Sequence, residues 1–110
     1  VHLSIDIDGM DGSLVPDTGT PVPGGLSMWH AVETIDTLFS NPKARVISAD
    51  VNEIVPGKDS PLTEFTAAML ATKVLAGHIG ARLDGRFTSD AGGKVREIED
   101  CNYFRSLSAL

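Results

Sequence analysis

The sequence predicts an α/β protein with a parallel sheet and helical crossovers. Hydrophobic and polar residues alternate over residues 1–8, and a second β-branched run follows over residues 45–49, so we expect a strand at each. Apolar residues recur at helical spacing over residues 27–39 and 60–83. Because strand and helix alternate along the chain, the strands are expected to lie parallel, with a helix crossing between them.

The composition fits one globular unit. The chain has 110 residues, of which 42% are hydrophobic and 22% charged, and this balance excludes a disordered chain. The net charge of −6 argues against a nucleic-acid partner, because phosphate contacts require an excess of Lys and Arg. No apolar run approaches the roughly 20 residues of a membrane span, and no signal peptide opens the sequence, so no membrane partner is expected. Because Cys101 is the single cysteine, a reducing, cytoplasmic location is the simplest expectation.

The first strand is expected to lead into a long, constrained loop. Over residues 1–8, the polar side that alternates with the apolar one consists of Ser4, Asp6 and Asp8. Residues 9–25 are rich in glycine and proline and show no periodicity. A segment of this length without regular structure is uncommon in a compact domain unless it has a function.

Each predicted helix has a recognisable start. Ser27 is suited to cap the first helix, and Asn41-Pro42 marks its end. The second helix starts with Ser60 and with Pro61 at its first position, and it continues through Leu83. Its apolar stripe is predicted to consist of Leu62, Phe65, Ala68, Met69, Thr72, Leu75, Ala76 and Ile79. The pattern weakens over residues 84–110, which we interpret as a tail.

Acidic residues gather where the first strand ends. Ligands of an open α/β sheet bind beyond the carboxyl ends of its strands. If Asp6 and Asp8 both belong to the strand, their carboxylates point into one crevice about 7 Å apart, and Asp11 follows in the loop. Three carboxylates this close in sequence give the hypothesis of a hard metal ion, and the alternative is that one carboxylate caps the loop while the other two are solvated. Asp50 or Glu53, after the second strand, is expected at the same edge.

These residues resemble the C-terminal signature of the arginase/agmatinase, or ureohydrolase, family. Within this family, the loop sequence is most similar to that of arginase. The pattern S-x-D-x-D-x-x-D-P-x-x-x-P-x-T-G-T-P-x-x-G-G-L is matched by Ser4-Ile5-Asp6-Ile7-Asp8-Gly9-Met10-Asp11, Pro16, Thr18-Gly19-Thr20-Pro21 and Gly24-Gly25-Leu26, with Gly12 in place of the proline after the third Asp. The family's D-x-x-E-x-x-P follows at residues 50–56. The resemblance covers residues 1–83 and implies the C-terminal portion of an arginase-like three-layer α/β/α fold, with residues 84–110 outside it.

The resemblance also implies site residues. Asp6 would bridge two Mn²⁺ ions and Asp8 would bind the second of them. Glu53 would pair with the substrate guanidinium, and Thr20 would line the substrate site. A role in holding the loop is implied for Asp11, Gly19, Gly24 and Gly25. The family's T-x-R-E, commonly used near subunit contacts, is replaced by Ser27-Met28-Trp29-His30, although a homo-oligomer is still expected for the complete protein.

The activity implied by the resemblance is manganese-dependent hydrolysis of a guanidino compound by a metal-bridging hydroxide, which releases urea and an amine. Arginine is the first substrate expected, and the alternative activities are those of an agmatinase or a formiminoglutamase. The family's other ligands lie in G-G-x-H and D-A-H-x-D motifs that these 110 residues lack. A different alternative is therefore a catalytically inert fragment or a non-enzymatic interaction domain. His2, His30 and His78 are expected to be structural or solvated.

Overall fold

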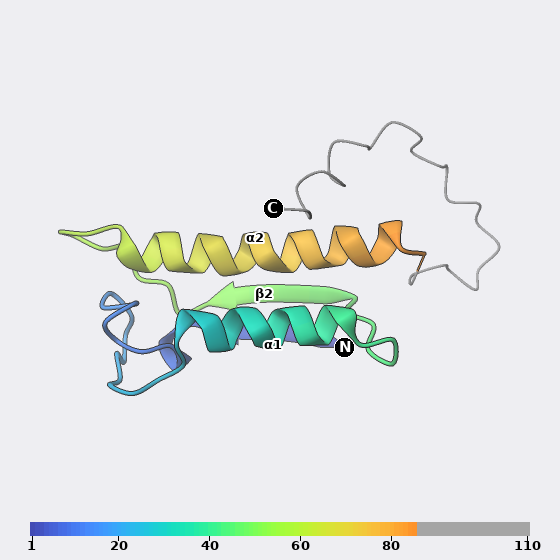
Figure 1. Cartoon of the computed structure of the whole chain (residues 1–110). Helices are drawn as coiled ribbons and strands as arrows, with labels where there is room; N and C mark the ends of the chain where they lie inside the picture. The colour runs from blue at the N-terminus through green and yellow to red at the C-terminus, as the bar shows by residue number, and fades with distance from the viewer. Residues whose placement is uncertain (86–110) are drawn as a thin grey trace.

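The computed structural model describes residues 1–85. Two parallel strands, β1 (His2–Asp6) and β2 (Ser48–Asn52), form a sheet, and a 3-10 turn, η1 (Ile7–Gly9), follows β1. The helices are α1 (Met28–Ser40), which crosses between the strands, and α2 (Leu62–Leu83), which packs against α1 (Figure 1). The predicted α/β class with a parallel sheet and a helical crossover is confirmed.

Both strands differ in extent from the prediction. β1 ends at Asp6 because the Asp6 carboxylate caps the following turn, where Oδ1 accepts a hydrogen bond from the Asp8 amide. β2 begins at Ser48, opposite His2, three residues after the predicted start. Val46, which belongs to the β-branched run, is instead buried in the core from the segment before β2. Pairing with β1, and not β propensity alone, therefore sets where β2 begins.

Helix α1 agrees closely with the prediction from the sequence. The Ser27 side chain accepts a hydrogen bond from the His30 amide, and His30 Nδ1 accepts one from the Ser27 amide. This reciprocal capping box confirms Ser27 as the N-cap and gives His30 a structural contact. The helix ends at Ser40, one residue before the Asn41-Pro42 stop.

Helix α2 ends at Leu83 as predicted, but it begins at Leu62, with Pro61 as the N-cap and not at the first helical position, and it buries a different face. The side chains of Phe65, Met69 and Leu75 are 69%, 57% and 62% exposed, so the predicted apolar stripe is wrong. The buried positions of the helix are Thr63, Thr66, Ala67, Leu70, Val74 and Ala81. Apolar residues occupy two faces of α2, and small residues on one of them allow close packing. A Cβ on Gly77 would lie 2.5 Å from the Phe39 ring of α1, so only glycine fits there.

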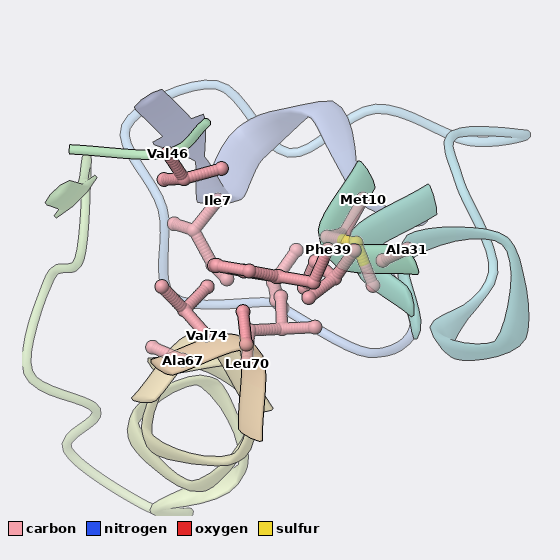
Figure 2. Close-up of a cluster of buried hydrophobic side chains, with 11 residues drawn as sticks. Ile7, Met10, Ala31, Phe39, Val46, Ala67, Leu70 and Val74 are labelled. Atoms are coloured by element: carbon pink, nitrogen blue, oxygen red, sulfur yellow. The ribbon is translucent and has the colours of Figure 1, made fainter. Parts of the chain in front are cut away.

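The core lies between the helices and one face of the sheet. Figure 2 shows Ala67, Leu70 and Val74 of α2 pointing toward Ile7 and Phe39. Leu3, Ile5 and Val51 line the apolar face of the sheet and pack against this cluster. Gly80, the other glycine of α2 after Gly77, has open space where a Cβ would be. Within residues 1–85, no helix has the length and hydropathy needed to cross a membrane.

Candidate functional site

The predicted metal ligands lie at the carboxyl end of β1, but not on one strand face. Asp6 is the last residue of β1, whereas Asp8 belongs to the turn η1. The alternation that would place both carboxylates side by side therefore stops at Asp6, and the prediction of an extended strand through Asp8 is wrong. The turn instead joins the two residues through the hydrogen bond from the Asp8 amide to Asp6 Oδ1, with an N···O distance of 3.3 Å.

The long loop returns to this strand end through Thr20. The Thr20 hydroxyl donates a hydrogen bond to Asp8 Oδ2, with an O···O distance of 2.5 Å. Figure 1 places the loop at the end of the molecule toward which β2 points, which is where the sheet presents its carboxyl ends. Thr20, expected to line a substrate site, thus also orients one of the two candidate ligands.

The donor atoms of this pair suit a hard divalent cation. Within residues 1–85, Asp6 Oδ2 and Asp8 Oδ1 accept no hydrogen bond, while the other oxygen of each carboxylate is engaged. Carboxylate oxygens are ligands that Mn²⁺ and Mg²⁺ prefer. Each residue therefore has one oxygen fixed by the protein and one oxygen open to an ion. No group of three or more His, Cys, Asp or Glu side chains in the described part of the chain is arranged to hold a metal.

Asp11 is turned into the loop. Its Oδ1 accepts hydrogen bonds from the Ser13 amide at 2.9 Å and the Ser13 hydroxyl at 2.5 Å, and its Oδ2 accepts one from the Gly24 amide at 2.7 Å. The side-chain bond from Ser13, followed by the two amide bonds, lowers the pKa of Asp11 below its ordinary value. The three carboxylates therefore do not converge on one cation, because both oxygens of Asp11 are engaged within the loop. Asp11 instead links the two ends of the loop.

Two of the three glycines singled out by the sequence have a steric role. Gly24, whose amide meets Asp11, has a φ of 75°, a region that side chains disfavour. A Cβ on Gly25 would lie 2.5 Å from the Met10 carbonyl carbon, so the loop passes too close to the backbone for any other residue. Gly19 has open space around it and a negative φ, and the structure shows no steric reason for glycine there.

Of the two acids near the end of the second strand, Glu53 lies at the same end of the sheet as Asp6. Glu53 directly follows β2, whose last residue, Asn52, pairs with Asp6. Its φ of 59° is a left-handed conformation that is strained for a residue with a side chain. Asp50 does not reach this edge. It lies within β2 opposite Ser4, so of the two acids expected at this edge, Asp50 or Glu53, the structure places Glu53 there.

The sequence reasoning missed the contacts of Asp50. Its Oδ2 lies 2.7 Å from His2 Nε2, and its Oδ1 accepts a hydrogen bond from the Ser4 hydroxyl at 2.9 Å. The missed signal is the period of two that Ser48, Asp50 and Asn52 share, which is hidden when the strand is expected to end at residue 49.

Known proteins resemble this chain over most of its described part. Residues 1–77 match the model of a family described as the Arginase family. The chain belongs to the Arginase family. The predicted family and its fold are thereby confirmed.

Relatives within the Arginase family carry several substrate names. The chain is 46% identical over 70 residues to the N(1)-aminopropylagmatine ureohydrolase of Thermococcus kodakarensis, covering 64% of this chain and 24% of that protein. It is 40% identical over 75 residues to the agmatinase of Pyrococcus horikoshii, with 68% and 26% covered. A crystal structure of arginase from Bacillus subtilis superposes with a TM-score of 0.60 at 36% identity, over 68% of this chain and 25% of the arginase. The chain thus spans about a quarter of the length of the relatives it matches.

Proposed function

We propose that the complete protein is a manganese-dependent ureohydrolase that hydrolyses a guanidino compound to urea and an amine. One observation carries the proposal. In a chain of the Arginase family, Asp6 and Asp8 each have one carboxylate oxygen without a hydrogen-bond partner among residues 1–85, and they lie at the end of the sheet where Glu53 follows β2. Asp6 and Asp8 would hold manganese, with further ligands from outside this chain. Manganese, when bound, would supply an activated water as the nucleophile.

The residues of this chain have separable roles in the proposed reaction. Glu53 would bind the substrate, because a carboxylate matches the planar fork of a guanidinium and can accept two parallel hydrogen bonds from it. This pairing would fix the guanidinium carbon relative to the strand end. Thr20 would keep Asp8 in one orientation through its hydroxyl. Asp11 would hold the loop that carries Thr20.

The substrate is proposed at the level of its guanidino group. The amino-acid sequence of the loop resembles that of arginase and so favours arginine, whereas the two curated relatives named above are an N(1)-aminopropylagmatine ureohydrolase and an agmatinase. A guanidino head is common to all of these substrates, and Glu53 is proposed to bind this head only. We therefore propose that Glu53 recognises the head and that residues outside this chain select the tail.

The test is an assay of the complete, manganese-loaded protein. Urea release is measured from arginine, agmatine and N(1)-aminopropylagmatine, and glutamate release from formiminoglutamate. We expect turnover of a guanidino substrate that falls at least about 100-fold in Glu53→Gln, because the charged partner of the guanidinium is lost. Asp59→Asn, the same kind of change in the exposed segment before α2, is the control and should retain activity. Turnover unaffected by Glu53→Gln would refute the assignment.

A catalytically inert chain is the alternative for these 110 residues alone. Two carboxylates provide fewer ligands than manganese requires, so the chain by itself is proposed to bind the ion weakly. Calorimetric titration of the isolated chain with Mn²⁺ separates the two cases. Tight binding of two ions would show that the chain needs no further ligands.

A further inference from the structure

The face of the sheet that does not contact the core is wholly polar. The parallel register sets its six side chains in three cross-strand rows, which pair His2 with Ser48, Ser4 with Asp50 and Asp6 with Asn52. All six residues are exposed, and the opposite face carries Leu3, Ile5 and Val51. The last row consists of Asp6, a candidate metal ligand, and Asn52, which directly precedes Glu53. Contacts that fix the side chains of the first two rows therefore also affect the position of the last row.

Asp50 occupies the centre of this polar face. Both of its carboxylate oxygens are bound to β1, one by His2 Nε2 at 2.7 Å and the other by the Ser4 hydroxyl at 2.9 Å. Because a carboxylate only accepts hydrogen bonds, His2 carries its proton on Nε2. In the neutral ring, Nδ1 then accepts from the Ser48 hydroxyl, which lies 2.8 Å away. The Asn52 amide approaches Ser4 at 3.5 Å and extends the network toward the site.

We infer that Asp50 is a positioning residue that fixes the placement of Glu53 relative to Asp6. The inference rests on the proposed function for its catalytic meaning. The candidate metal ligands belong to β1 and its following turn, whereas the guanidinium partner follows β2. Their relative position therefore depends on the register between two strands of only five residues each. A slip of one residue would turn every side chain of a strand to the other face.

The bonds of Asp50 resist such a slip. They join one residue of β2 to two residues of β1 that are two positions apart, so movement along the strand axis would break at least one of them. The strained backbone of Glu53 adds to this dependence. Because Glu53 directly follows β2 and has a φ of 59°, a displaced β2 would move this constrained residue relative to Asp6.

The test uses the complete manganese-loaded protein with Asp50→Ala. We expect the KM for the guanidino substrate to rise about tenfold, because two hydrogen bonds to a charged group are lost between the strands. The affinity for Mn²⁺, measured by calorimetry, should change less than about twofold, since the ligands of β1 are intact. Asp36→Ala is the matched control. Asp36 is also a half-exposed aspartate bound to a second element, through Lys73 of α2, but it lies away from the site.

A double variant separates positioning from general stability. If Asp50 acts through Glu53, Asp50→Ala should add less than about twofold to the loss already caused by Glu53→Gln. The alanine change suits this cycle because it removes both acceptor oxygens at once. An unchanged KM in Asp50→Ala, or a full additional loss in the Glu53→Gln background, would overturn the inference.

Hydrogen exchange of the complete protein keeps the inference separate from the proposed activity. Backbone amides of β1 and β2 should exchange faster in Asp50→Ala than in Asp36→Ala, whether or not the protein turns over a guanidino substrate. Equal exchange of these amides in the two variants would overturn the positioning role. Absence of turnover by the unmodified protein would instead overturn the proposed function.

Discussion

Leu70→Ala in the 110-residue chain tests which face of α2 is buried. Leu70 is 0% exposed and points into the cluster between the two helices (Figure 2). The substitution removes three carbon groups, which corresponds to about 2.4 kcal/mol of transfer free energy. The cavity left in a closely packed core raises the expected loss in the free energy of unfolding to about 3 kcal/mol.

Leu75→Ala on the same helix is the matched control. The Leu75 side chain is 62% exposed, so the same substitution should change the free energy of unfolding by less than about 0.5 kcal/mol. Urea unfolding followed by circular dichroism measures both variants. We expect a much lower urea midpoint, or no folded baseline, for Leu70→Ala alone. Equal destabilisation by the two substitutions, or a larger effect of Leu75→Ala, would refute it.

Three further predictions concern the loop, the helix contact and the strained residue. Asp11→Asn should be less stable than the unmodified chain at neutral pH. Because the folded-state pKa of Asp11 is lowered from 3.8, this difference should disappear as the pH falls below that value, which urea unfolding at several pH values checks. Gly77→Ala should destabilise the chain by about 1–3 kcal/mol, because its methyl group would meet the Phe39 ring. Gly80→Ala, in open space, should stabilise it by about 0.5–1 kcal/mol, and thermal melts of the pair decide the point. Glu53→Gly should raise the free energy of unfolding by about 1 kcal/mol because it relieves the positive φ, whereas Glu53→Ala should not. The same urea titration compares these two, and an equal gain in both would contradict the strain.

Local signals predicted helix α1 well because this helix carries its own start and stop. Ser27 caps α1 through a side-chain oxygen that acts within its own turn, and Asn41-Pro42 ends the helix by backbone geometry. Such interactions span a few residues and are visible in the sequence. The start of β2 depends instead on a partner strand more than forty positions away, and a β-branched run does not reveal that pairing.

The buried face of α2 could not be predicted from hydrophobicity. The exposed face holds the larger apolar residues Phe65, Met69 and Leu75, and periodicity therefore favours it. The face that is buried is the one where Gly77 admits Phe39. Shape complementarity between two helices decides that choice, and it requires both surfaces to be known.

The candidate site was predictable in its residue types but not in its geometry. Asp6, Asp8 and Glu53 were identified by motif, and the structure places Asp6 and Glu53 at the same end of paired strands. The early end of β1 was not predictable from alternation, because it results from a side chain of Asp6 that bonds its own backbone two residues later. The contacts of Asp50 were missed for the related reason that they follow from the strand register.

The central claim is that this chain supplies Asp6 and Asp8 to a manganese centre. Calorimetric titration of the complete, metal-free protein with Mn²⁺ tests it most directly, with Asp6→Asn as the variant and Asp59→Asn as the control. We predict two ions bound by the unmodified protein and by Asp59→Asn, and a lost or at least about tenfold weakened ion in Asp6→Asn. Two ions bound by Asp6→Asn with unchanged affinity would contradict the account.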